Sequence, residues 1–93
     1  MHSATEQVRQ TLTTMVVNII LLRPHQLRRF SFFKTGLDSR SGDQICAALS
    51  KADTTSITSF LLDQNPEWFD SEDQINKWAA VFKNQPELEE LWL

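Results

Sequence analysis

The 93-residue sequence contains only two glycines, three prolines and one cysteine, and it has no long hydrophobic run. So few glycines and prolines argue against a long disordered or low-complexity segment. The single cysteine, Cys46, cannot form a disulfide within one chain, which predicts a reducing compartment, the cytoplasm. The apolar run from Met15 to Leu22 contains Asn18 and falls short of the roughly 20 residues that span a bilayer. We therefore expect a cytoplasmic protein with no membrane partner.

The sequence also lacks a recognisable catalytic or metal site. Catalysis by Cys46 would need a neighbouring histidine as base, but His2 lies near the terminus and His25 in a loop before a strand. A buried apolar side chain is the favoured reading of Cys46. The acidic residues between Asp63 and Asp73 lack regular metal-ligand spacing and suit a solvated loop and helix start. We predict no enzyme activity, no metal and no cofactor.

Charge is unevenly distributed along the chain. Residues 1–46 carry six basic and three acidic side chains, whereas residues 47–93 carry three basic and nine acidic ones. The ring of Phe33 could stack on a nucleobase, but the basic residues near it form only a small patch in an acidic protein. We therefore predict no nucleic-acid partner. These basic residues are Arg23, Arg28, Arg29, Lys34 and Arg40.

Three stretches share one pattern, with large apolar residues at the first, fourth and sixth places. They are Leu27–Phe32, Ile57–Leu62 and Leu88–Leu93, and their starts are separated by 30 and then 31 residues. The alternation within each stretch is typical of a half-buried strand. We predict strands at these three places, the first reaching Phe33.

Helical patterns precede each predicted strand. Each pattern follows a Ser and a Glu or Gln spaced as in a capping box: Ser3 and Glu6, Ser41 and Gln44, Ser71 and Gln74. The first helix would place Val8, Leu12, Met15, Val16 and Ile19 on one face and end at Arg23–Pro24. The second would reach about Ala52 with Ile45, Ala48 and Leu49 on one face, and the third would align Ile75, Trp78, Ala79 and Phe82.

These elements divide the chain into a helix followed by repeats. Within a single domain, residues 1–26 form the amino-terminal helix, 27–56 the first repeat, 57–87 the second and 88–93 a partial third. The recurrence of strand, loop, capping box and helix at one offset is the signature of a repeat architecture. The helix over residues 1–26, with its broad apolar surface, is expected to cap the first strand.

The repeats resemble the leucine-rich repeat family, in its ribonuclease-inhibitor-like subclass. The apolar places of each strand match, and the place that holds Asn in the family is occupied by Thr35 and then by Asn65. The next apolar place holds Leu37 in the first repeat but Glu67 in the second, with Trp68 beside it, so a local departure is expected. The resemblance implies an α/β fold, a short solenoid of three parallel strands with helices on the convex side. Because the chain stops at a strand edge, we expect either a piece of a longer repeat protein or an edge covered by another chain.

The resemblance also implies a partner-binding surface on the concave strand face. Carried over residue by residue, this surface comprises Arg28, Arg29, Ser31, Phe33, Ser59, Leu61, Asp63, Glu89, Glu90 and Trp92. Because like places of a parallel solenoid stack in rows, basic residues would lie at one end and acidic residues at the other. This order suggests head-to-tail self-association; the alternative is that the charges merely keep the strand edges apart.

We therefore expect a non-enzymatic protein–protein interaction module. Two alternatives remain open from the sequence. One is a structural subunit whose carboxyl-terminal strand edge is covered by a partner. The other is a small all-helical adaptor domain in which the supposed strands are loops or short helices.

Overall fold

A computed structural model describes residues 2–32, 35, 37–52 and 56–93. Helices and strands alternate in the order α1 (His2–Leu22), β1 (Arg29–Ser31), α2 (Ser39–Lys51), β2 (Ser59–Leu61), α3 (Glu72–Lys83) and β3 (Glu90–Trp92). Short 3-10 helices, η1 (Pro24–Gln26) and η2 (Pro66–Phe69), precede β1 and α3. The chain is thus an α/β domain as predicted, and the all-helical alternative is wrong.

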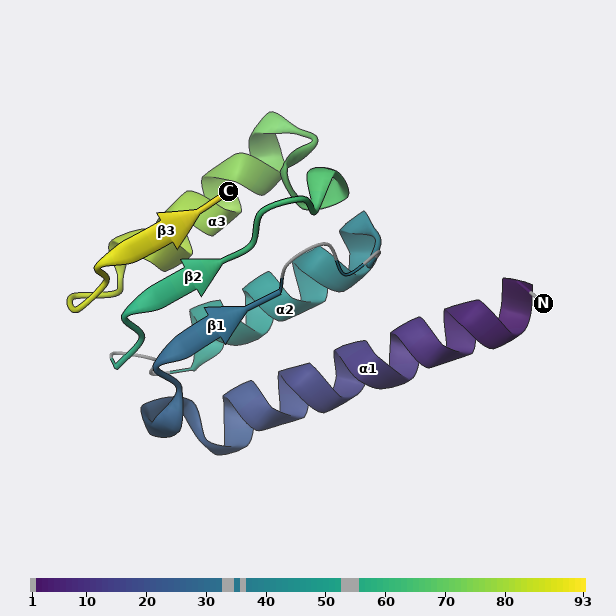
Figure 1. Ribbon diagram of the computed structural model, residues 1–93, viewed down its shortest axis with the longest axis horizontal. Helices are drawn as coiled ribbons and strands as arrows, with labels where there is room; N and C mark the ends of the chain where they lie inside the picture. Colours follow the sequence, from purple (N-terminus) through teal and green to yellow (C-terminus); the bar gives the residue numbers. More distant parts are fainter. Residues whose placement is uncertain (1, 33–34, 36, 53–55) are drawn as a thin grey trace.

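The three strands form one parallel sheet in the order β1-β2-β3. In Figure 1 they lie side by side in front of α2 and α3, with α1 alongside α2. Phe30 pairs with Phe60, and Phe60 with Leu91, so the three apolar stretches lie in equivalent register. Phe30 and Phe60 are buried, whereas Leu91 on the outer strand is 43% exposed and does not lie in the interior. Each strand is only three residues long, shorter than the sequence pattern predicted, but lies inside the predicted segment.

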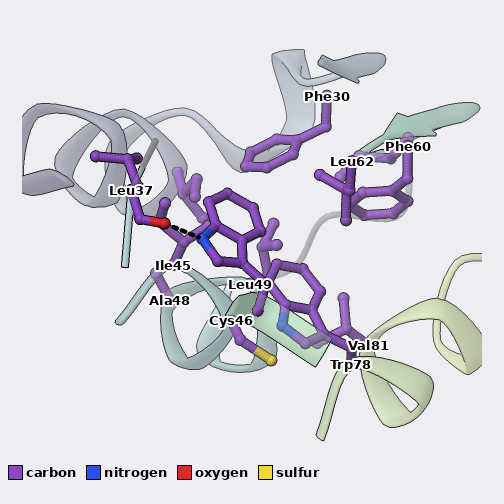
Figure 2. Close-up of a cluster of buried hydrophobic side chains, with 13 residues drawn as sticks. Phe30, Leu37, Ile45, Cys46, Ala48, Leu49, Phe60, Leu62, Trp78 and Val81 are labelled. Carbon is purple, nitrogen blue, oxygen red and sulfur yellow. Dashed lines mark hydrogen bonds between the residues drawn. The ribbon is translucent and has the colours of Figure 1, made fainter. Parts of the chain in front are cut away.

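The core fills the space between the sheet and the helices (Figure 2). Phe30 and Phe60 point into it from the strands and are 4% and 0% exposed. Behind them the rings of Trp68 and Trp78 stack, with centroids 5.7 Å apart and planes 2° from parallel. Offset stacking of buried indoles stabilises a core beyond the area that they bury.

The predicted helix starts are right for one helix out of three. Ser71 and Gln74 make both hydrogen bonds of a capping box at the start of α3. The cap of α2 is Asp38, whose carboxylate accepts from the Ser41 backbone amide, so Ser41 lies inside the helix. An aspartate at this place is an equally good acceptor, and it precedes Ser41 in the chain. Helix α1 begins at His2, so Ser3 also lies within its helix.

Helix α1 packs differently from the prediction. It contacts α2 and η1, rather than covering the edge of β1. The side facing the molecule carries Thr13, which is fully buried. Its hydroxyl donates to the Arg9 carbonyl at 2.8 Å and accepts from the Ser41 hydroxyl at 2.9 Å. The predicted apolar face is instead half exposed, with Leu12 48% and Ile19 52% accessible. No helix in the described part of the chain is long and apolar enough to cross a membrane.

Candidate functional site

The described helices all lie behind one face of the sheet (Figure 1), and we call the other face the open face. Because side chains alternate along a strand, the residues flanking the buried central position of each strand point to this face. The strand register arranges these residues in two rows across the sheet. The first row is Arg29, Ser59 and Glu90, and the second is Ser31, Leu61 and Trp92.

The open face has a charge gradient and an aromatic end. Arg29 lies on the outer strand β1 and Glu90 on the opposite outer strand β3, with the neutral Ser59 between them. Trp92 is 55% exposed, and its indole nitrogen donates to the Glu90 carboxylate at 3.1 Å. This bond holds the indole along its own strand, where its ring is available to a partner.

The remaining predicted site residues lie at the ends of the strands. Arg28 and Glu89 directly precede β1 and β3 and are exposed. Thr58 lies between them, accepting from the Glu89 amide and donating to the Arg28 carbonyl, so all three are neighbours. Asp63 follows β2 and is half buried. Phe33 lies outside the described residues.

Asn65 links the turns that follow β1 and β2. Its side-chain amide donates to the backbone carbonyls of Phe32 and Leu62, while its oxygen accepts from the amide and hydroxyl of Thr35 at 3.1 and 2.8 Å. Asn65 is only 4% exposed, so these bonds satisfy a buried polar group. The two residues that occupy the same place in successive repeats thus bond directly to each other, and the turns beneath the open face are joined.

The departure expected beside Glu67 is a one-residue shift. The 3-10 helix η2 turns Glu67 to solvent and buries Trp68 completely. The Trp68 indole nitrogen then donates to the Leu37 carbonyl at 3.2 Å, a bond drawn in Figure 2. Trp68 therefore replaces the apolar residue that Leu37 supplies in the first repeat.

Cys46 is buried in α2, as predicted, and is 2% exposed. Burial, together with the nearby Asp43 carboxylate, raises the pKa of the Cys46 thiol to about 11. A thiol with this pKa is protonated near neutral pH and is a poor nucleophile. His25 lies on the exposed 3-10 helix η1. Among the described residues no group of His, Cys, Asp and Glu is arranged to hold a metal ion.

The sequence did not reveal an apolar surface at the carboxyl-terminal side of the molecule, formed by Ile75, Ala79, Phe82, Leu91 and Leu93. The sequence pattern aligns Ile75 with Trp78 on one helix face, but Ile75 is 49% exposed whereas Trp78 is buried. The corresponding residue of the preceding repeat, Ile45, is fully buried. A sequence signal for this surface is the equivalence of the two positions. Helix α3 carries an isoleucine where α2 has a buried one, but nothing in the described structure covers it.

Comparisons of the chain with protein-family models, with curated proteins and with solved structures give no match.

Proposed function

We propose that this protein is a short leucine-rich-repeat-like solenoid that binds a protein partner through its open face, without catalysis. Three features support the repeat assignment. The strands are parallel and stack in equivalent positions. Successive helices lie side by side, α1 on α2 and α2 on α3. The buried Asn65 joins two successive turns through backbone and side-chain bonds. The lone, buried Cys46 fits a cytoplasmic location.

The observation that carries the binding role is the composition of the open face. Its exposed residues include Arg29 and Trp92, which are residue types that often dominate the binding energy of interfaces. Leu61 is half buried between them and offers an apolar centre. A polar rim around an apolar centre, held on short strands by a rigid core, is the usual anatomy of a protein-binding surface.

A photo-reactive amino acid at Ser59, in the middle of the open face, tests this proposal in cells. We expect it to crosslink a protein partner, while the same amino acid at Ala80, an exposed site on α3, does not. The purified partner should then bind at least about tenfold more weakly to Trp92→Ala and to Arg29→Ala than to the unaltered protein. Arg40→Ala, which removes an exposed arginine from α2, is the control. Equal crosslinking from Ala80, or a partner indifferent to both open-face substitutions, would refute the proposal.

A second candidate function is that of a subunit in a larger assembly. The apolar residues of the carboxyl-terminal side favour it, because Leu91, Trp92 and Leu93 are 43%, 55% and 59% exposed. Exposed apolar residues along a free strand edge are characteristic of surfaces that another chain covers.

A further inference from the structure

We propose that the carboxyl-terminal side of one molecule binds the amino-terminal side of a second copy, extending the sheet from β3 of the first to β1 of the second. This inference gives the second candidate function its partner. It concerns the two outer edges of the sheet and does not depend on what the open face binds.

The backbone hydrogen bonds already present define how a further strand would pair. The Arg28 carbonyl accepts from the amides of Thr58 and Ser59, and the Thr58 carbonyl accepts from those of Glu89 and Glu90. In each case the carbonyl of the residue before one strand accepts from two amides at the start of the next strand. If the pattern continued into a second copy, the Glu89 carbonyl would accept from the amides of its Arg28 and Arg29.

The far ends of the strands follow the same rule. Phe32 donates its amide to the Leu61 carbonyl, and Leu62 donates to the Trp92 carbonyl, both at 2.8 Å. The next step would join the Leu93 amide to the Ser31 carbonyl of the second copy. The two outer strands β1 and β3 lack strand partners on these sides in the described structure, and their free groups have complementary positions.

Charge complementarity identifies a second copy as the occupant. In the continued register Arg29 of one molecule would lie directly opposite Glu90 of the other, and Arg28 opposite Glu89. Opposite charges directly across a sheet attract, and like charges repel. A single chain carries both the basic edge, at β1, and the acidic edge, at β3, so a second copy can supply the complementary charges.

Apolar surfaces complete the match behind the sheet. On the carboxyl-terminal side a hollow of about 280 Å³ is walled by Ile75, Trp78, Ala79 and Phe82 of α3, with Phe69 and Leu93. On the amino-terminal side a hollow of about 290 Å³ opens between α1 and β1, with Ile19 and Phe30 in its wall.

The helices are aligned so that these two surfaces lie at the same height along the helix axes. The hydrogen bond between Thr13 and Ser41 sets the first turns of α2 beside the middle of α1. The later half of α1, with Met15, Ile19 and Leu22 exposed, is therefore the part that would meet α3 of another molecule. The amino-terminal half of α1 extends past the other helices (Figure 1).

The contact joins two different surfaces, so a pair of molecules keeps one free surface of each kind. Such heterologous contacts build open chains unless rotation closes them into a ring. We therefore expect the mass of the full chain, measured by sedimentation velocity and light scattering, to rise with protein concentration. High salt should reduce the association because the paired charges lie at the surface.

Charge reversal provides the decisive experiment. Arg29→Glu sets a glutamate opposite Glu90, and Glu90→Arg sets an arginine opposite Arg29, so each variant alone should associate about tenfold more weakly than the unaltered protein. An equimolar mixture should recover association, because the Glu90 edge of the first variant then meets the Arg29 edge of the second. The controls are Arg40→Glu and Glu67→Arg, which make the same charge changes at exposed residues away from both edges.

A crosslink tests the register independently. In a Cys46→Ser background, Arg29→Cys and Glu90→Cys molecules should form a disulfide when mixed, because opposed residues on neighbouring strands lie within disulfide reach. A protein that stays monomeric at all concentrations would overturn the proposal and leave recognition by the open face untouched. Association that persists in both charge-reversal variants, but is lost on Leu12→Glu, would also overturn it and indicate pairing between α1 helices.

Discussion

Gly42 packs directly against the Trp68 ring in the core, which makes Gly42→Ala a sharp test of the structure. A methyl group added at Gly42 would lie 2.8 Å from the Cδ1 and Cγ atoms of Trp68 and 3.1 Å from its Cδ2 atom. Carbon atoms in contact normally lie about 3.5–4.0 Å apart. The indole has little room to retreat, because it is fully buried and stacks on Trp78.

Two opposing effects set the expected size of the change. Alanine favours a helix interior over glycine by about 0.8–1 kcal/mol, so helix propensity alone would make the variant more stable. Overpacking a filled core costs about 1–3 kcal/mol. We expect the overlap with Trp68 to prevail, because the propensity gain is smaller near a helix start, and the free energy of unfolding to fall by about 1–2 kcal/mol.

Urea unfolding followed by circular dichroism measures the change. Ala47→Gly, at an exposed site in the same helix, should lower the stability by about 1 kcal/mol through propensity alone. The two substitutions are chemically opposite, yet both should destabilise the protein. In a Trp68→Leu background, Gly42→Ala should cost less, since the ring it meets is gone. A Gly42→Ala protein more stable than the parent would show that Trp68 does not lie against this helix.

Three further predictions concern buried groups. Trp68→Phe should destabilise more than Trp78→Phe, by about 1 kcal/mol in thermal unfolding, because, of these two buried indoles, that of Trp68 donates a hydrogen bond, to the Leu37 carbonyl, and that of Trp78 does not; equal losses would contradict the bond. Asn65→Asp should cost about 3 kcal/mol at pH 7 and more than Asn65→Ala, because a carboxylate would face the carbonyls of Phe32 and Leu62; the reverse order in urea unfolding would be inconsistent with the described bonds. The raised pKa of Cys46 means that unfolding releases a proton from the thiol at high pH, so its contribution to stability should be lost as pH rises from 9.0 to about 11. Cys46→Ala should show a weaker decline over that range, and identical pH profiles would exclude this contribution.

The positions of the strands could be predicted because their pattern is local and recurs. Phe30 and Phe60 fall at the same place of stretches 30 residues apart, and the sheet pairs them directly. The rows of side chains on the open face follow from this pairing, and one of these rows has Arg29 at one end and Glu90 at the other. Parallel strands need a crossover connection of this kind, and the helical patterns between the stretches supplied it.

The packing of α1 could not be predicted from periodicity. A repeating apolar stripe shows that a helix has an apolar face, but it does not show on which side a neighbour lies. The side that packs on α2 contains Thr13, whose hydroxyl meets that of Ser41, 28 residues away in the chain. Contacts of this kind depend on the tertiary arrangement, which no local window of sequence contains.

The details of the candidate site were predicted unevenly. The family pattern placed Thr35 and Asn65 at equivalent positions, yet it did not show that their side chains bond to each other. The pattern also could not locate the exposed carboxyl-terminal side, since Ile45 and Ile75 occupy equivalent positions and differ only in whether a further helix covers them.

The contacts between elements run strictly from neighbour to neighbour. Helix α1 contacts α2, and α2 contacts α3, whereas α1 and α3 share no contact in the described structure; the strands follow the same order. Mechanical or thermal disturbance at one end therefore reaches the other through the middle of the molecule, which is formed by α2, β2 and η2. Amide hydrogen exchange should be slowest around Phe60 and faster toward both outer units. Local unfolding is then expected to start at the outer units and proceed toward the middle one.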